Sequence, residues 1–375
     1  MKANNKKHIA VIEGDGIGPE VTQQSIKVLN AIAEQYNHEF TYSYYLMGAI
    51  AIDQTGNPLP DETIEGCLNS DAVLFGAIGH PKYDNDPNAK VRPEQGLLKL
   101  RKSLELFANL RPIATYPALH HLSPLKPKNL ENVDFVIYRE LTSGIYFGEK
   151  TKSEDGTVAS DLCSYNSDEI KRIAKLAFEH ARIRNKKLTL VDKANVMETS
   201  RLWRKVVQEM APDYADVTVD YLFVDNAAMQ IIVNPKQFDV MLTENLFGDV
   251  LSDEASVIAG SLGMLPSASI GNKVALFEPI HGSYPQAAGK NIANPIGSIL
   301  SAAMLLDHFG LTEAATDVRE AVQWALQNGF VTQDIDAVNN YSTTSVGDLI
   351  VDFVSGKIPG SAKKENIQLR KSTII

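Results

Sequence analysis

Short apolar runs that alternate with longer segments of helical periodicity most constrain how this 375-residue chain can fold. Residues 9–12, 72–75 and 188–191 have the length and composition of buried strands, and residues 134–138 and 238–242 repeat the pattern. Helical periodicity predicts helices near residues 19–34, 168–184, 198–210, 294–309 and 312–328. Strands that alternate with helices predict an α/β fold with a mostly parallel sheet.

Charge and cysteine content narrow the class of protein. The net charge is −10, which argues against a dedicated binder of nucleic acid or of an anionic membrane. Cys67 and Cys163 are too few for a disulfide scaffold, and a reducing compartment is the simpler interpretation. The apolar run at residues 8–12 is too short for a signal-peptide core, and no run approaches the ~18 apolar residues of a membrane span. We therefore expect a soluble, cytoplasmic protein.

Two glycine-rich segments resemble nucleotide-binding motifs without matching them. Gly14, Gly16 and Gly18 follow the first predicted strand, but a Rossmann fingerprint needs glycine where Pro19 stands. Gly282 and Gly289 are too far apart for a P-loop. The first segment predicts a tight strand–helix turn that lines a site. The second segment could still form a glycine-rich loop that binds a nucleotide in some other geometry.

Three arginines stand where an acidic substrate could bind. Arg101 lies at the edge of a helical face that we expect to contain Leu97, Leu100, Leu104 and Phe107. Arg111 lies ten residues further on, directly before Pro112. Arg139 comes at the end of the strand predicted at residues 134–138. Arg101 alone could be a surface arginine whose stem covers apolar residues. Together the three could clamp a dicarboxylate, because guanidinium groups bind carboxylates in a bidentate manner.

Carboxylates and one lysine supply further candidate chemistry. Asp249 and Asp253 are one helical turn apart and share a face, and Asp225 follows another apolar run. Oxygen ligands suit Mg²⁺ or Mn²⁺, although helix capping and solvation would also explain these residues. Lys193 follows the strand at residues 188–191 and could act as a base, with Tyr146 as its acid partner. Either residue alone could be structural.

The polar, alternating segment at residues 147–161 contains Asp155-Gly156, a turn sequence typical of hairpins. This segment could form a projecting hairpin that serves as a dimer arm. A solvated loop is an equal alternative.

Six motifs in this order resemble the β-decarboxylating hydroxyacid dehydrogenases, the family of the isopropylmalate and isocitrate dehydrogenases. They are GDGIGPE at 14–20, RPEQGLLKLRKSLELFANLRP at 92–112, RELTSGIYFGE at 139–149, DKANVMETSRLWR at 192–204, NLFGDVLSDEAS at 245–256, and EPIHGS with AGKNIANP within 278–295. Together they cover nearly the whole chain.

The resemblance implies a role for each matching residue. Tyr146 and Lys193 would be the catalytic pair, and Asp225, Asp249 and Asp253 the ligands of Mg²⁺ or Mn²⁺. The substrate would contact Glu94, Leu97, Leu98, Arg101, Arg111, Arg139 and Asp225. NAD would contact Ile17, Glu94, Glu278, His281, Gly282, Ser283, Tyr284, Gln286, Asn294 and Asp334, and the loop at residues 79–94 would line its nicotinamide side.

The resemblance also implies an architecture. It predicts two α/β domains, neither of them a Rossmann domain. The first would be discontinuous, with residues 1–106 and 260–375 and the NAD site. The second would span residues 107–259 and carry the hairpin arm at the interface of a homodimer. Lys193 and Asp225 would enter the active site of the neighbouring subunit.

The implied activity is the NAD-dependent oxidation and decarboxylation of 3-isopropylmalate to 4-methyl-2-oxopentanoate and CO₂, a step of leucine biosynthesis. Leu97 and Leu98 favour this substrate over those of dehydrogenases for isocitrate, homoisocitrate or tartrate, because an isopropyl group needs an apolar wall. A nucleotide-dependent phosphotransferase and a non-catalytic binding protein are the alternatives from other classes.

One position departs from the family pattern. Gln286 stands where relatives have an aspartate that binds the adenosine ribose and repels the 2′-phosphate of NADP. Gln286 and Ala287 also lack the basic character that relatives use to bind this phosphate. The sequence therefore favours NAD because it lacks these basic residues, and not because of an acidic residue at position 286.

Overall fold

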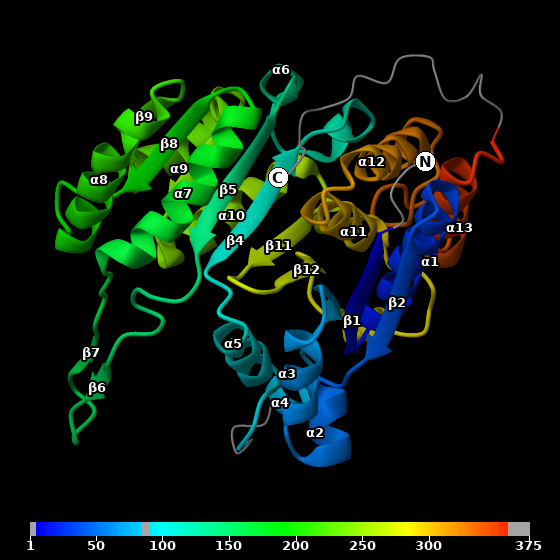
Figure 1. Ribbon diagram of the computed structural model, residues 1–375, viewed down its shortest axis with the longest axis horizontal. Coiled ribbons are helices and arrows are strands. Elements are labelled where there is room, and N and C mark those ends of the chain that lie inside the picture. The colour runs from blue at the N-terminus through cyan, green and yellow to red at the C-terminus, as the bar shows by residue number, and fades with distance from the viewer. Residues whose placement is uncertain (1–4, 85–89, 359–375) are drawn as a thin grey trace. The chain divides into compact units, whose positions relative to one another are not determined.

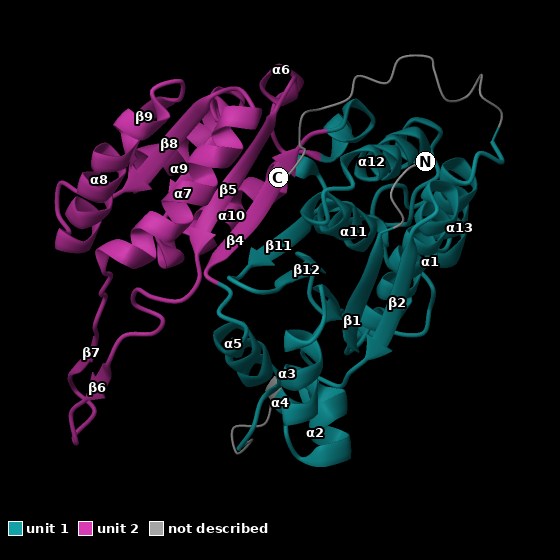
Figure 2. Cartoon of the chain, in the orientation of Figure 1, with its two compact units in different colours: residues 1–106, 116–122, 259–375 teal, residues 107–115, 123–258 magenta. Residues whose placement is uncertain are grey.

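The computed structural model describes residues 5–84 and 90–358. The chain forms two compact units (Figure 2). Unit 1 contains Met1–Leu106, Tyr116–Leu122 and Ala259–Ile375, and unit 2 contains Phe107–Thr115 and Ser123–Ile258. Within the described ranges, no helix is both long enough and apolar enough to cross a membrane.

Unit 1 contains five strands in the order β2-β1-β3-β12-β11 (Figure 1). Their bounds are β1 Lys6–Gly14, β2 Glu39–Tyr44, β3 Ala72–Ala77, β11 Pro266–Ile270 and β12 Ala275–Pro279. β1 pairs in parallel with β2 and β3, β3 pairs in parallel with β12, and β11 is antiparallel to β12. The Ile9–Ile12 stretch of β1 is fully buried, as expected of a parallel strand covered on both faces.

The helices of unit 1 pack around these strands. They are α1 Gly18–Tyr36, α2 Ala49–Thr55, α3 Asp61–Leu68, α4 Pro81–Asp84, α5 Pro93–Ser103, α11 Ile296–His308, α12 Thr312–Gln327 and α13 Thr343–Val354. α1 packs against α11 and α13; α1 also contacts β1, β2 and β3, and α11 contacts β11 and β12 (Figure 1). Pro19 lies in the first turn of α1, where its missing N–H would have no intrahelical partner anyway.

Unit 2 contains the strand order β4-β5-β10-β8-β9 and a separate hairpin. The bounds are β4 Ala108–Ala114, β5 Asp134–Glu140, β6 Lys150–Lys152, β7 Ala159–Asp161, β8 Lys187–Asp192, β9 Thr218–Phe223 and β10 Val240–Thr243. Only β4 is antiparallel to its unit 2 neighbour, β5, in this five-strand order. The prediction of an α/β fold with a mostly parallel sheet is confirmed.

Four of the five α-helices described in unit 2 form two packed pairs. The five are α6 Pro127–Leu130, α7 Ser167–Ile183, α8 Glu198–Met210, α9 Val224–Val233 and α10 Asn245–Ser256. α7 packs against α8, α9 packs against α10, and both pairs contact the strands. β6 and β7 form an exposed hairpin whose turn contains Gly156 with a φ of 70°.

One sequence expectation about α5 is wrong. The helical face was expected to continue through Leu104 to Phe107, but α5 ends at Ser103. Glu105 adopts a left-handed φ of 52°, and the Leu106 N–H donates to the Arg101 carbonyl. This terminal turn releases the chain into β4, so Phe107 is buried next to the strand.

Candidate active site

Arg101 is the charged residue among the substrate-binding candidates of unit 1 that could pair with a carboxylate. Its Nη2 donates to Glu278 Oε1 at 3.1 Å, and Glu278 is buried on β12. The Nε of Arg101 is also buried and has no hydrogen-bond partner within the described part of the chain. A buried guanidinium N–H without a partner costs free energy, so this atom fits an anionic ligand that is not part of the protein.

One face of α5 carries Glu94, Leu98 and Arg101, which are spaced at helical intervals; Glu94 and Leu98 are exposed, whereas the Arg101 side chain is mostly buried. The Leu98 side chain is 51% exposed, whereas Leu97 packs against the core of unit 1. Leu98 therefore offers an apolar contact beside the arginine. Leu97 instead anchors α5 to the core of unit 1.

Arg139 of unit 2 is held on several sides by its own chain. Its Nε and Nη2 donate to Asn245 Oδ1 at 3.1 and 3.0 Å, and its Nη1 donates to Asp249. A Cβ at Gly248 would lie 2.6 Å from Arg139 Cγ, so only glycine fits where α10 crosses this side chain. Arg111 Nε donates to Asn109 Oδ1 at 2.7 Å on the neighbouring strand β4.

Tyr146 reaches the same carboxylate as Arg139. Its hydroxyl donates to Asp249 Oδ2 at 2.7 Å, and the Arg139 guanidinium lies 5.8 Å from the ring centroid. Partial burial, followed by the hydrogen bond to Asp249, raises the pKa of Tyr146 above its ordinary value. Tyr146 is therefore a protonated donor throughout the neutral pH range.

The loop before Tyr146 is fixed by a buried carboxylate. Glu140 accepts hydrogen bonds from the Thr142 N–H and hydroxyl and from the Ser143 N–H. Gly144 has a φ of 80°, and a Cβ there would lie 2.2 Å from the Tyr165 hydroxyl oxygen. The loop conformation thus depends on glycine at this position.

Lys193 follows β8 and is paired within its own chain. Its Nζ donates to Asp225 Oδ1 at 2.7 Å, and this hydrogen bond is the main cause that lowers the pKa of Asp225. The preceding residue, Asp192, is buried and accepts two hydrogen bonds from Arg204, both at 2.8 Å. This bidentate pair fixes the end of β8, from which Lys193 projects.

The three aspartates proposed from the sequence as metal ligands do not meet in one chain. Asp249 and Asp253 lie one turn apart on α10, whereas Asp225 is in the first turn of α9. The described residues contain no cluster of three histidine, cysteine or acidic side chains that could hold a metal ion. The two carboxylates of α10 still form an oxygen-only donor set, which fits Mg²⁺ or Mn²⁺ once further ligands are supplied.

A cavity of 690 Å³ in unit 1 coincides with much of the sequence-predicted cofactor site. Its lining includes the predicted residues Ile17, His281, Gly282, Tyr284, Asn294 and Asp334. The predicted residues Glu94, Glu278, Ser283 and Gln286 are outside this lining. Residues 85–89 of the loop predicted to line the nicotinamide side lie outside the described residues.

The polar groups of this cavity are organised around Asp334. Its Oδ2 accepts from the Ser261 hydroxyl at 2.5 Å and from Asn294 Nδ2 at 3.0 Å. Burial lowers the pKa of His281, which favours the neutral imidazole, and its buried Nε2 has no hydrogen-bond partner in the described structure. Apolar walls with a few polar groups are typical of a nucleotide site, so the lining fits the adenosine part of a dinucleotide.

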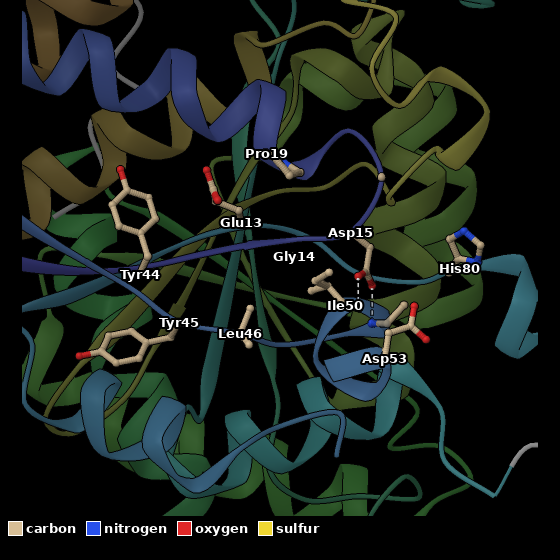
Figure 3. A pocket seen from close by; sticks show the side chains of 12 residues that line it. Glu13, Gly14, Asp15, Pro19, Tyr44, Tyr45, Leu46, Ile50, Asp53 and His80 are labelled. Atoms are coloured by element: carbon tan, nitrogen blue, oxygen red, sulfur yellow. Dashed lines mark hydrogen bonds between the residues drawn. The ribbon is translucent and has the colours of Figure 1, made fainter. Parts of the chain in front are cut away.

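A second cavity of unit 1, of 390 Å³, lies beyond the turn at residues 14–19 (Figure 3). Gly14, Asp15, Gly16 and Pro19 line it, whereas Ile17 of the same turn lines the larger cavity. The turn thus separates the two cavities.

Several residues of these sites were not predicted from the sequence. Asn245 lies within a recognised motif, but at the start of a helix it is indistinguishable from a cap. The cavity also uses Ser261, Leu262, Gly263, Ile292, Ala293, Gln333 and Ala337. The first three belong to a short 3₁₀ turn, η5 Leu262–Met264, and to the residue before it, which have no sequence signal of their own.

The comparisons with known proteins agree with this arrangement. The family model described as isocitrate/isopropylmalate dehydrogenase matches residues 8–350. The chain is 54% identical to a 3-isopropylmalate dehydrogenase of Bacteroides fragilis over 92% of this chain and 98% of that protein. It is 52% identical to the 3-isopropylmalate dehydrogenase of Bacillus subtilis over 90% of this chain and 94% of that protein.

Solved structures show the same likeness. An isocitrate dehydrogenase from Methylococcus capsulatus superposes with a TM-score of 0.82 at 33% identity, covering 93% of this chain and 99% of that one. A β-decarboxylating dehydrogenase from Thermococcus kodakarensis gives a TM-score of 0.79 at 38% identity, covering 93% and 96%. Sequence motifs, fold and both kinds of comparison agree, and the chain belongs to the isocitrate/isopropylmalate dehydrogenase family.

Proposed function

We propose that this protein catalyses the NAD-dependent oxidation and decarboxylation of 3-isopropylmalate to 4-methyl-2-oxopentanoate and CO₂, in leucine biosynthesis. Two relatives named 3-isopropylmalate dehydrogenase support this proposal. The one from Bacteroides fragilis is 54% identical over 92% of this chain, and the one from Priestia megaterium is 50% identical over 96%. The structural observation that carries the substrate assignment is the face of α5, where the exposed Leu98 accompanies Arg101. An apolar side chain beside a guanidinium suits a substrate with an isopropyl group next to carboxylates.

The arginines bind the two carboxylates of the substrate. Arg101 supports this role with its buried, unpaired Nε, and Arg139 is oriented in advance by Asn245. Arg111 on β4 completes the clamp. Glu94 would contribute to the same site, since it lies on the same face of α5 as Arg101, whereas Leu97 packs against the core and would act only by supporting α5.

Lys193 and Tyr146 move the protons of the reaction. NAD held in the cavity of unit 1 would supply the hydride acceptor for C2, and Mg²⁺ or Mn²⁺ held by Asp249 and Asp253 would supply a Lewis acid for the oxygen on that carbon. Lys193 Nζ, in its neutral form, takes the proton of the C2 hydroxyl. After the carboxylate on C3 leaves as CO₂, the Tyr146 hydroxyl donates its proton to C3. A tyrosine hydroxyl is protonated at neutral pH, so the Tyr146 hydroxyl has a proton to donate when the carbanion forms.

The 690 Å³ cavity is the site that we propose for NAD, and Glu278, Ser283 and Gln286, which lie outside its lining, would contact parts of the cofactor that extend beyond it. Asp334 supports NAD over NADP, since its carboxylate lies in the lining and would repel a 2′-phosphate. Gln286 is exposed and lies outside that lining. Asp249 and Asp253 would bind Mg²⁺ or Mn²⁺, with Asp225 supplied by a second subunit.

The protein acts as a homodimer in this proposal. α9 and α10 pack against each other and leave apolar side chains uncovered: Met229 is 59% exposed, Val233 61% and Val250 59%. Exposed apolar groups on adjacent helices are typical of a surface that another chain covers. The β6–β7 hairpin would add to this interface, and Lys193 and Asp225 would enter the partner's site. We place the enzyme in the cytoplasm, consistent with two free cysteines.

The test is purified protein with Mg²⁺, NAD or NADP, and a panel of 2-hydroxy acids that carry a second carboxylate on C3. Reduced nicotinamide should form fastest with isopropylmalate and NAD, and chelation of the divalent ion should abolish turnover. Faster turnover of isocitrate would assign the chain to the other branch of the family. If isopropylmalate gave no turnover with either cofactor, the proposal would be wrong.

A further inference from the structure

Asp15 is a buried carboxylate that the proposed chemistry does not use. It belongs to the turn between β1 and α1 and is 6% exposed. Its Oδ2 accepts from the main-chain N–H groups of Ala49 and Gly79 at 2.8 and 2.9 Å, and its Oδ1 accepts from Ile50 at 2.9 Å. Figure 3 shows the two hydrogen bonds toward α2. Three main-chain donors on one carboxylate join three separate segments of unit 1.

The first of these joined segments is the start of α2. Ala49 and Ile50 are its first two residues, and its N-cap, Gly48, has no side chain to accept from them. Asp15 supplies the missing cap from another part of the chain, where a negative charge is favoured by the helix dipole. A Cβ at Gly48 would lie 2.4 Å from Asp15 Oδ2, so the glycine makes room for the carboxylate.

The second joined segment begins at Gly79, directly after β3. While its N–H donates to Asp15, its carbonyl accepts from the Ser283 hydroxyl at 2.7 Å. The Ser283 carbonyl in turn accepts from the Ile17 N–H at 2.8 Å. These hydrogen bonds form a closed chain of contacts. It runs from Asp15 to Gly79, then to Ser283, and back to Ile17 in the same turn as Asp15.

This closed chain of hydrogen bonds connects two walls of the larger cavity. Ile17 lines the cavity from the turn, and Gly282 and Tyr284 line it from the loop on either side of Ser283. A shift of Gly79 would take the acceptor away from the Ser283 hydroxyl, so that of these contacts the Ile17–Ser283 hydrogen bond alone would hold the loop against the turn. Charge-assisted hydrogen bonds are stronger than neutral ones, so Asp15 is well suited to hold Gly79 in place.

We propose that Asp15 is a positioning residue for the dinucleotide cofactor, and that it acts through Gly79 and Ser283 on the shape of the cavity. The inference rests on the proposed function, since it takes the cavity to be the cofactor site. Asp15 touches neither the substrate site on α5 nor Tyr146 or Lys193 in any hydrogen bond of the described residues. Its loss should therefore weaken cofactor binding and leave the chemical step nearly unchanged.

The test is Asp15→Asn, which keeps the size of the side chain but turns an –NH₂ group toward a main-chain donor. We expect the Kd for NADH, measured from nicotinamide fluorescence, to rise about 10-fold or more, because the amide carries no negative charge, which weakens the contacts to Ala49, Ile50 and Gly79, and replaces one acceptor with a donor. kcat at saturating cofactor should change less than about threefold. Asp53→Asn is the matched control: Asp53 lines the neighbouring cavity from α2, is exposed, and accepts from Lys82 at 2.6 Å. It should leave the Kd unchanged.

A double-mutant cycle separates positioning from general stability. Asp15→Asn and Ser283→Ala both act on Gly79, so their combined effect on the Kd should be smaller than the product of the single effects. Multiplicative effects, or a lower melting temperature with an unchanged Kd, would overturn the proposal. If Asp15→Asn does not fold, Asp15→Ser, which keeps a small acceptor suited to a helix cap, takes its place in the same cycle.

Hydrogen exchange gives a readout that does not depend on the cofactor. The main-chain amides of Ala49, Ile50 and Gly79 should exchange faster in the Asp15 variant than in wild type. Unchanged exchange at these amides would overturn the positioning role. Failure of the wild-type protein to bind NADH or NADPH would instead overturn the proposed function, so the two failures are distinguishable.

Discussion

Single charged side chains of the candidate site are oriented before any substrate binds. Arg139 is buried and donates to Asn245 from two nitrogens, and Arg101 is paired with the buried Glu278. A side chain that is already held loses little further conformational freedom on binding, so more of its interaction energy appears as affinity. This orientation is what we expect of arginines that recognise carboxylates at fixed separations.

Arg101→Ala should raise the KM for isopropylmalate and leave the KM for NAD nearly unchanged. The loss of a charge-assisted contact of about 1.5–3 kcal/mol corresponds to about 10- to 150-fold in kcat/KM. Lys102→Ala is the control, because Lys102 is exposed on the same helix. Steady-state kinetics measure both effects, and a KM for isopropylmalate equal to that of wild type would reassign Arg101 to packing.

Leu98→Ala should reduce the preference for isopropylmalate over malate. Removing part of an apolar contact costs about 1–3 kcal/mol for the substrate that uses it, and nothing for a substrate without the isopropyl group. Leu68→Ala, on α3, is a matched control because Leu68 is also partly exposed. Competition between the two substrates gives the ratio of kcat/KM values. Equal losses for both substrates would show that Leu98 does not contact the isopropyl group.

At the scale of elements, the first half of α10 carries two residues, Asn245 and Asp249, that contact the candidate site residues of unit 2. Asn245 and Asp249 both hold Arg139, and Asn245 Nδ2 also donates to the Ser143 carbonyl in the loop that leads to Tyr146. The helix therefore couples the positions of an arginine, a tyrosine and a carboxylate. Residues that share one rigid helix keep their separations better than residues on independent loops.

The residue before α10 makes the stability of unit 2 depend on pH. Burial raises the pKa of Glu244 to about 7, with a smaller contribution from nearby Asp192 and an opposing one from the Ser200 hydroxyl bond. A carboxyl whose pKa is raised on folding is fully stabilising only while it is protonated in both states. Its contribution is present below the unfolded-state pKa near 4.5 and is lost as pH rises toward 7.

Glu244→Gln should remove this pH dependence. Relative to the glutamine variant, wild type should lose on the order of 2–3 kcal/mol between about pH 4.5 and 7 and change little above that. Thermal or urea unfolding of both proteins across this range gives the difference. Glu198→Gln, at the exposed start of α8, should follow wild type. A constant difference between wild type and Glu244→Gln at all pH values would contradict the raised pKa.

At the scale of the whole molecule, the proposed active site needs a second copy of the chain. Lys193 and Tyr146 each hydrogen-bond to a different aspartate of their own chain, Asp225 and Asp249. The uncovered apolar side chains of α9 and α10 supply the surface through which two copies would associate. In the dimer that we propose, Lys193 of one subunit works with Tyr146 of the other.

Subunit complementation tests this arrangement. Lys193→Ala and Tyr146→Phe homodimers should each be nearly inactive, and re-forming dimers from a mixture of the two should restore activity. One site of each heterodimer then carries both lesions and the other carries neither. Random pairing should return roughly a quarter of wild-type activity, if the sites are independent. If both residues served their own chain, a mixture with demonstrated subunit exchange would show no rescue.

The sequence predicted the elements whose signals are local. The buried strands at residues 9–12, 72–75 and 188–191 and the long helices were found because apolar periodicity records which face is buried. The end of α5 was missed because the left-handed Glu105 interrupts an apolar pattern that continues past it. The motifs also identified the family, since their residue types and order reflect chemistry that few other sites require.

Tertiary structure decided the contacts that cross long stretches of chain. Nothing near Asp15 in the sequence indicates that it binds the main chain at Ala49 and Gly79, because main-chain donors are present at every residue except proline. The short turn around Leu262 became a cavity wall only because folding placed it beside Asn294 and Asp334. Periodicity and residue chemistry are properties of the chain itself, whereas the partners of a buried polar group are selected by which segments fold against it.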